Sequence, residues 1–269
     1  MRTLVIGASI VITDTQPDGA DRRRAGGAAL ETAIGLTRLG HDVEFLTNIA
    51  PDDDGMLIVY RALDHNVRIR PASFTAERTP TAGAHDADVA ASTRGWVMPA
   101  LRALAPEEHL HIASLSTLLS PDAHRLLSLM DAARRRGSRV SLDATPDEVA
   151  EGDKAQLLTN LVAAVDAATL VHITPATLTS FYPAESTAAA LTRMRDRKQL
   201  RSVGKTRATT LVLSSHDEWA HTMQHRRLDA AAARGRVVAT LIHASGLSTT
   251  ATPRKRQTRK HLFDHVNGS

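Results

Sequence analysis

The chain has 269 residues and lacks cysteine. This absence excludes a disulfide framework and thiolate chemistry, and it is typical of a cytoplasmic protein, which is where we expect this one. Aromatic residues are also scarce, at 3%, whereas apolar residues make up 42%. The core must therefore be built from Ala, Leu, Val and Ile. The length suits one large α/β domain or two small ones.

Long hydrophobic runs are missing as well. No run approaches the length of a membrane span, so we expect no membrane partner. The segment LVIGASIVI, residues 4–12, is apolar but too short for an export signal with a cleavage site. It predicts a buried first strand.

The net charge is +4, and several of the basic residues lie in PRKRQTRKH, residues 253–261. A basic tail can bind nucleic acid, but more often such a run is a solvated chain end. Nothing in the sequence interleaves aromatic with basic residues as nucleic-acid-binding modules do. We therefore interpret residues 251–269 as a flexible basic tail without a nucleic-acid partner.

Strand and helix patterns alternate along the chain. Apolar and β-branched runs predict strands over residues 2–12, 41–49, 108–115, 138–144, 168–173, 209–215 and 236–244. Helical patterns occupy residues 30–40, 56–66, 120–137 and 153–166, and the third of these has Ser120 as cap, Pro121 in its first turn and Gly137 as its end. This alternation predicts a mostly parallel sheet covered on both faces. Residues 74–96 are shorter and alternating, which predicts a small antiparallel excursion that could serve as a lid.

Candidate ligand contacts follow from this sheet. Ligands of open parallel sheets bind beyond the carboxyl ends of the strands. Those ends carry Asp14 after the first strand, Asp143 at the end of 138–144, and Ser245 with Gly246 after 236–244. The fold would bring these separate positions together.

The stretch RAGGAALETAIGLTRLGHDVEFLT, residues 24–47, contains the pair Gly26 and Gly27 just before an amphipathic helix. Glycine lets another molecule approach the backbone, and a helix N-terminus offers N–H groups to anions. Glycine pairs also mark tight turns, which need no ligand. The local pattern leaves both interpretations open and favours the turn.

The order of these segments resembles that of the ribokinase-like (PfkB) carbohydrate kinases, and most of all the fructokinase-like members. The likeness begins in GGAALETAIGLTRLGHDVEFLTNIAPDDDG and in ERTPTAGAHDADVAAS, which is similar to the lid strands of the family. It continues in HLHIASLSTLLSP, VSLDATP and ITPATLTSFYP, and it covers Met1 to about Thr250.

The resemblance implies a Rossmann-like three-layer α/β sandwich over residues 1–250, with a small β lid from residues 12–24 and 68–96. It implies transfer of the γ-phosphoryl group of ATP to a sugar hydroxyl, with Mg²⁺ as cofactor and fructose as one candidate sugar. Homodimers formed through the lid are a further implication.

The same resemblance implies the site residues. Sugar contacts fall on Gly26 and Gly27, on Glu31 where the family has Asn, on Asp143, and on Asp14, two residues after the aligned Ile12. Nucleotide contacts fall on Ser214 and on the segment that aligns with the family's Gly-Ala-Gly-Asp, namely Ala244, Ser245 and Gly246.

The chain departs from the family pattern at the catalytic motif. Leu247 aligns with the catalytic Asp, and leucine cannot accept a proton, so no catalytic residue is assigned. The segment after Leu247 is also short and polar compared with the helices that cover adenine in the family. Two functions remain: an impaired sugar kinase, and a non-catalytic scaffold or binding protein of the same fold.

Three further clusters have ordinary alternatives. His109 and His111 face the same way on a strand, as in a metal edge, but no third ligand can be assigned and polar contacts are more common. Residues 52–54, all Asp, lack the spacing of a Ca²⁺ loop and predict a turn and helix cap. Residues 22–24, all Arg, could pair with a phosphate but favour a solvated loop. We expect no metal site of the protein's own.

Overall fold

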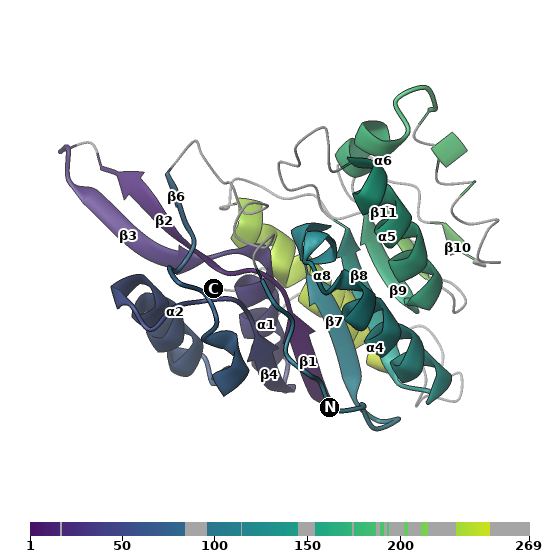
Figure 1. The fold of residues 1–269 in the computed structure, drawn as a ribbon, viewed down its shortest axis with the longest axis horizontal. Coiled ribbons are helices and arrows are strands. Elements are labelled where there is room, and N and C mark those ends of the chain that lie inside the picture. The colour runs from purple at the N-terminus through teal and green to yellow at the C-terminus, as the bar shows by residue number, and fades with distance from the viewer. Residues whose placement is uncertain are drawn as a thin grey trace, which may run out of the picture.

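The computed structural model describes residues 1–16, 18–83, 96–113, 115–144, 154–173, 175–186, 189–190, 193, 202–203, 211–214 and 230–247. Within them, two sheets form (Figure 1). The main sheet has the order β10-β11-β9-β8-β7-β1-β4-β5 and the lid sheet the order β3-β2-β6. The main strands are β1 (Arg2–Ile6), β4 (Asp42–Leu46), β5 (Arg68–Ile69), β7 (His109–Ala113), β8 (Arg139–Ala144), β9 (Leu170–Ile173), β10 (Ser202–Val203) and β11 (Leu211–Ser214).

The main sheet is parallel from β9 to β5, whereas β11 pairs antiparallel with both β9 and β10. The first strand of the chain lies in its interior, where Val5 pairs with Phe45 on one side and His111 on the other. The prediction of a mostly parallel sheet is confirmed.

Helices cover both faces of the main sheet, which gives three layers (Figure 1). The helices are α1 (Ala28–Arg38), α2 (Asp53–Asp64), α4 (Ala123–Arg135), α5 (Lys154–Ala167), α6 (Pro175–Phe181) and α8 (Ala230–Leu247), with short 3₁₀ turns η1 (Pro71–Ser73) and η2 (Leu115–Leu119). Alternate strand residues face opposite layers: Val5 packs with α1 and α8, whereas Leu4 and Ile6 pack with α4 and α5. The three-layer α/β prediction is confirmed.

The first apolar run divides between the two sheets, so its prediction as one strand over 2–12 is wrong. β1 ends at Ile6, and β2 (Ile10–Thr15) begins the lid sheet. Between them the chain crosses closely over β7, because a Cβ on Gly7 would lie 2.5 Å from the carbonyl oxygen of Ala113. Glycine permits this crossing, and it lets one apolar run supply both sheets.

The lid sheet pairs β2 antiparallel with β3 (Asp21–Gly26) and parallel with β6 (Thr81–Gly83). The antiparallel excursion expected over 74–96 is therefore corrected at β6, and residues 84–95 lie outside the described ranges. Residues 68–69 form β5 of the main sheet rather than part of the lid. Residues 22–24 form strand β3, not a solvated loop.

The prediction of a strand over 236–244 is wrong, because these residues belong to helix α8. α8 packs against α1 and the sheet, and its consecutive residues 237–242 are all buried. A helix buried on several sides has no polar face, so it shows no period that separates it from a strand. Close packing on α1 also requires small residues: a Cβ on Gly35 would lie 2.8 Å from that of Ala239.

Two helix ends test the predicted caps. Asp52 caps α2 by accepting a hydrogen bond from the N–H of Gly55 at 2.7 Å, which confirms the turn and cap. α4 begins at Ala123, and Ser120 instead donates to the carbonyl of Trp96 at 2.6 Å. Gly137 follows α4 with a positive φ of 86°, as expected of a helix end.

In the described part of the chain, no helix has both the length and the apolar character needed to cross a membrane. The predicted tail lies outside that part.

Candidate functional site

The glycine pair joins the lid to α1. Gly26 ends β3, and Gly27 is the N-cap of α1 with φ 105° and ψ 144°. A Cβ on Gly27 would lie 3.1 Å from the carbonyl oxygen of Ala8 and 3.2 Å from the Cα of Ser9, and one on Gly26 would lie 2.8 Å from Cδ1 of Ile12. The backbone conformation and close backbone contacts thus account for Gly27 as a turn residue, whereas a side chain at Gly26 would first meet the end of the Ile12 side chain, and contact with a sugar stays a prediction.

Glu31 lies in the first turn of α1, four residues after Gly27, and is only 8% exposed. Its carboxylate accepts a hydrogen bond from Nη2 of Arg61 on α2 at 2.5 Å. Gly235 of α8 rests directly on it, because a Cβ at Gly235 would lie 2.5 Å from Cβ of Glu31 and 2.8 Å from the N of Thr32. Sequence reasoning did not identify this junction, which packs Gly235 of α8 on the first turn of α1.

The direction of α8 follows from its two ends. Gly235 contacts the start of α1, whereas Nδ1 of His243 lies 3.0 Å from Nε2 of His41, which directly precedes β4. α8 therefore runs from the carboxyl edge of the parallel strands towards their amino edge.

This direction corrects the expected place of residues 244–246. Ala244, Ser245 and Gly246 are helical and follow His243, so they lie in the last turns of α8 and not after a strand. They come nine or more residues after Gly235, a rise of roughly 14 Å along a helix. The N-terminus of α8 lies at Ala230, and whether it is the helix N-terminus implied by the resemblance stays a prediction. Whether residues 244–246 contact a nucleotide stays a prediction.

α8 carries no carboxylate. Its sequence, AAAARGRVVATLIHASGL, contains neither Asp nor Glu. The family's catalytic Asp therefore has no counterpart on this helix in any alignment register. The absence of an acid, expected at Leu247, holds equally at Gly235, where the structure places the start of the helix against α1.

Asp14 and the arginines of β3 pair within the lid region. Nε of Arg24 donates to Oδ2 of Asp14 at 2.7 Å, and Arg23 pairs with Asp54 at the start of α2. The side chain of Asp14 is 35% exposed. The predicted sugar contact at Asp14 thus lies on the lid strand beside an arginine.

Asp143 lies at the end of β8 but is fully buried. Its Oδ1 is 2.7 Å from Nδ1 of His172 on the neighbouring β9. Asp143 therefore belongs to the interior between the sheet and the α1–α8 layer, not to an open surface. Ser214 ends β11, where it pairs with Leu170, and its side chain lies outside the described set.

His109 and His111 share one partner. Nε2 of His109 lies 2.7 Å, and Nδ1 of His111 2.8 Å, from Oγ of Ser141 on β8. The two histidines therefore make ordinary polar contacts, which was the alternative to a metal edge. Among the residues that the structure describes, no group of three or more His, Asp or Glu could hold a metal ion.

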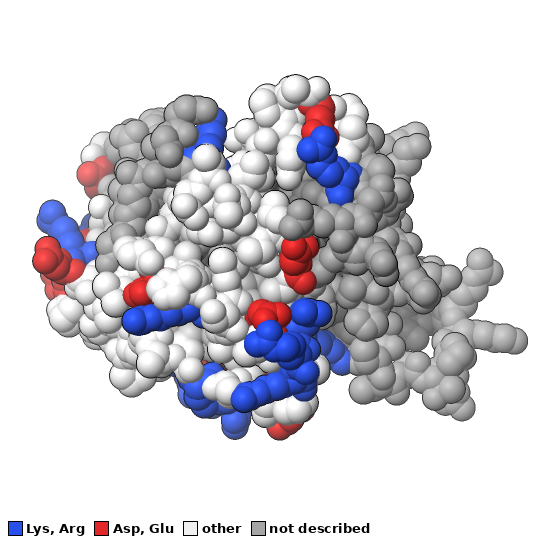
Figure 2. All heavy atoms as spheres, turned by 45° about the vertical axis from the view of Figure 1, so that its right-hand side comes forward, with Lys and Arg blue, Asp and Glu red and all other residues white. Residues whose placement is uncertain are grey.

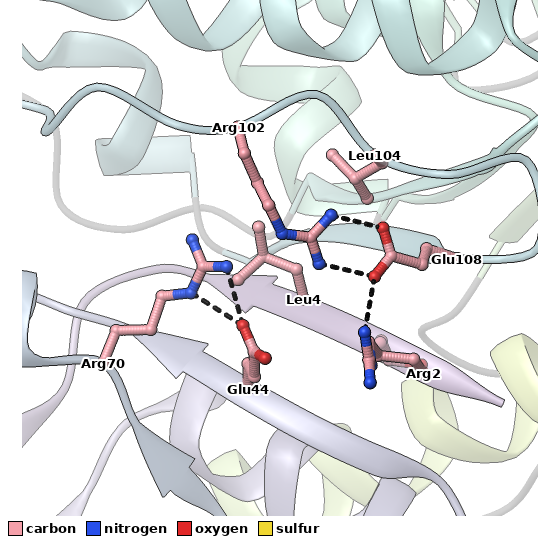
Figure 3. A pocket seen from close by; sticks show the side chains of 8 residues that line it. Arg2, Leu4, Glu44, Arg70, Arg102, Leu104 and Glu108 are labelled. Atoms are coloured by element: carbon pink, nitrogen blue, oxygen red, sulfur yellow. Dashed lines mark hydrogen bonds and ion pairs between the residues drawn. The ribbon is translucent and has the colours of Figure 1, made fainter.

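A small pocket lies at the opposite, amino edge of the sheet, beside Leu4 (Figure 3). Its polar lining consists of two ion-paired groups, Arg102–Glu108–Arg2 and Arg70–Glu44. Hydrogen bonds from Arg102 lower the pKa of Glu108 to about 2. Because its arginines are paired with acids, this pocket has little free charge to offer a ligand. Figure 2 likewise shows basic and acidic side chains next to each other near the lower edge of the face drawn.

Comparison with known proteins identifies the fold. No family model and no curated protein matches the sequence. Among solved structures, the chain is similar to an aminoimidazole riboside kinase from Salmonella enterica, determined with aminoimidazole riboside and an ATP analogue, at 16% identity and TM-score 0.71 over 99% of this chain and 91% of that one.

Two fructokinases are similar as well. The enzyme from Vibrio cholerae, determined with fructose, ADP and calcium, has 17% identity and TM-score 0.68 over 91% of this chain and 84% of that one. The enzyme from Xylella fastidiosa with bound ATP has 19% identity and TM-score 0.56 over 73% and 69%. At these identities the likeness establishes the ribokinase-like fold.

Proposed function

Because the chain has the ribokinase-like fold, we propose that it binds a sugar and ATP and transfers the γ-phosphoryl group to a sugar hydroxyl, but slowly. The observation that carries this proposal is the junction at the carboxyl edge, where the glycine turn, Glu31 and the start of α8 meet. The fold supports the substrate class, since its solved neighbours include kinases determined with a sugar and a nucleotide.

The sugar is proposed to bind beside Gly26 and Gly27, between the lid strand that carries Asp14 and the first turn of α1. Glu31, which the resemblance aligns with a sugar-binding Asn, is proposed to contact the sugar hydroxyls from the first turn of α1. Phosphate groups would meet the N-terminal turn of α8, whose backbone N–H groups and small side chains suit an anion.

The slow rate follows from the missing acid. A positioned general base is worth roughly 10²–10⁴ in rate, and α8 has no carboxylate that could serve as one, while its His243 lies at the opposite end of the helix against His41. Glu31 is held by Arg61, and a carboxylate engaged with a guanidinium is a weak proton acceptor. What remains is the positioning of the two substrates, which contributes to phosphoryl transfer without a base.

Magnesium supplies charge neutralisation to phosphoryl transfer when it is bound. The described residues contain no acidic cluster to hold it, so we assign it no protein ligand and derive no step through it. Mg²⁺ commonly keeps several water ligands and binds through the phosphates of a nucleotide, so it could enter with ATP.

A second candidate is a non-catalytic protein that keeps the fold for binding. The absence of Asp and Glu from all of α8 favours it directly. The kinase requires binding of a sugar and ATP together with turnover, whereas the non-catalytic scaffold or binding protein requires no turnover.

A thermal melt distinguishes binding from its absence. The protein is heated with Mg-ATP, with a panel of sugars that includes fructose and aminoimidazole riboside, and with both. A ligand at 100 times its Kd adds about 2.7 kcal/mol to the free energy of unfolding, which for this length is a rise of roughly 5–10 °C. A rise is expected with a sugar and ATP together, and no rise with any combination contradicts the kinase and leaves the non-catalytic scaffold.

A phosphoryl-transfer assay then separates the two candidates. Slow ADP formation that depends on the sugar supports the kinase. Glu31→Gln should reduce the sugar-induced rise in melting temperature, whereas Asp131→Asn, an exposed acid on α4, should not. Binding without any sugar-dependent ADP formation supports the non-catalytic candidate.

We also propose that the protein is cytoplasmic and forms homodimers through its lid sheet. The exposed first half of β3, residues 21–23, supports a lid surface that could pair with a second copy. Light scattering gives the molar mass in solution, and a monomer at high concentration contradicts the proposed dimer.

A further inference from the structure

A layer of buried polar side chains lies on the face of the sheet covered by α1 and α8. His109 and His111 each use one ring nitrogen towards Ser141, and their other nitrogens, Nδ1 and Nε2 respectively, are buried without a hydrogen-bond partner. A neutral imidazole tolerates this, since it has one N–H to place. A protonated ring would bury a second N–H, and a charge, with no acceptor.

A second pair of histidines ties α8 to this layer. Nε2 of His41 lies 3.0 Å from Nδ1 of His243, and Nδ1 of His41 lies 3.0 Å from Oγ1 of Thr3 on β1. A hydrogen bond between two imidazoles needs one nitrogen without a proton. When both rings are protonated, the acceptor is gone and two positive charges face each other.

The groups around His41 offer it no compensation. It faces Thr3 on β1, His243 on α8, Arg139 on β8 and the amino group of Met1, which are neutral or positive. The adjacent Asp42 is engaged by Arg2 and Arg68. Burial first, and then these positive neighbours, lower the pKa of His41 to about 4.

The histidines on β7 behave alike. Burial lowers the pKa of His111 to about 4, although Asp143 opposes the shift, and burial together with the potential of His111, His41 and Arg139 lowers that of His109 well below its ordinary value. Burial also lowers the pKa of His243 on α8. His172, on β9, is paired with Asp143.

We propose that this histidine layer makes the docking of α8 on the sheet sensitive to pH, so that α8 is held most tightly while the rings are neutral and its docking weakens in mild acid. The consequence is local, because α4 and α5 pack on the other face through apolar side chains. The proposal does not depend on the proposed kinase activity.

The direction and size of the effect of pH on the docking of α8 follow from proton linkage. A histidine whose pKa is lower when α8 is docked favours docking above pH 6.5, and this preference is lost as the pH falls from 6.5 towards about 4. For one such histidine, the docking constant should fall about thirtyfold between pH 7.5 and pH 5. Two or more linked histidines multiply this factor.

Hydrogen–deuterium exchange of the full chain tests the proposal. Protection of α8, residues 230–247, is compared with that of α4, residues 123–135, at pH 7.5 and pH 5, after correction for the intrinsic effect of pH on exchange. We expect protection of α8 to fall at least thirtyfold while that of α4 changes little. A change in α8 below threefold, or equal losses in both helices, would overturn the proposal.

A matched pair of variants adds a second reading. His243→Asn keeps an oxygen acceptor for His41 in its protonated form but cannot itself be protonated, so the fall in protection of α8 should become shallower. His124→Asn removes an exposed histidine on α4 and should leave the fall unchanged. Circular dichroism at pH 7.5 establishes that both variants are folded. Equal falls in the two variants contradict the role of His243.

Discussion

Replacing Gly27 by alanine should weaken the protein more than its conformation alone explains. The residue has φ 105° and ψ 144°, a region open almost only to glycine, and occupying it costs an L-residue on the order of 1–3 kcal/mol. The new Cβ would also lie 3.1 and 3.2 Å from two backbone atoms, which cannot rotate away. Overpacking of this kind adds roughly 1–3 kcal/mol. We therefore expect Gly27→Ala to lower the free energy of unfolding by about 3 kcal/mol.

Gly40 provides the matched control. It also has a positive φ, 82°, but no atom lies within 4 Å of its added Cβ. Gly40→Ala should therefore cost only the conformational part, about 1–2 kcal/mol. The entropy that alanine removes from the unfolded chain is the same in both variants and cancels. Urea unfolding followed by circular dichroism measures the two losses. A loss at Gly27 no larger than that at Gly40 would refute the close contact of α1 with the β1–β2 connection.

Three other substitutions test separate parts of the structure. Glu108, whose pKa is lowered from 4.5 to about 2 chiefly by hydrogen bonds from Arg102, stabilises the fold above pH 4.5, and this contribution is lost as the pH falls towards 2. Because Arg102 is half exposed, we expect Glu108→Gln to cost about 1–2 kcal/mol at pH 7. The free energy of unfolding should then fall by that much less between pH 7 and pH 2 than it does in the parent. Equal falls in the two proteins, measured by urea unfolding over this pH range, contradict this. Gly235→Ala should cost about 2–4 kcal/mol by forcing α8 away from Glu31, and unaltered urea stability would disprove their close packing. Asp52→Ala removes the acceptor of three hydrogen bonds, so thermal melts should reveal a loss of about 1–3 kcal/mol, and a melting temperature equal to that of the parent would show the cap to be dispensable.

Local pattern predicted most of the layers correctly. The run 41–49 and the helix that follows Gly27 each have the right length, period and flanking residues for their element, and both were found as expected. The run 2–12 misled because periodicity records burial and not which sheet a strand joins. The contacts that hold the connection between β1 and β2 are long-range, such as that of Gly7 with Ala113, more than a hundred residues away, and that of Ser9 with Thr47.

The candidate site was less predictable for a related reason. The run 236–244 is apolar on all sides, so β-branched residues there favoured a strand although the preceding alanines favour a helix. Misplacing α8 also misplaced the start of the helix on which the expected nucleotide contacts depended, because α8 begins at Ala230 and not near Ala244. The contact between Glu31 and Gly235 joins residues some two hundred positions apart, and a single sequence carries no signal for it.

The interior position of β1 bears on how the chain folds. Residues 2–6 are synthesised before both of their partners, residues 42–46 and residues 109–112, so the second pairing closes a loop of more than a hundred residues. Such long-range parallel pairings slow folding, because the entropy of loop closure is lost before the contacts form. During synthesis the apolar first strand must therefore wait, with an unpaired edge, until β7 has left the ribosome. We expect refolding to be slow and to be limited by the joining of β7 to β1.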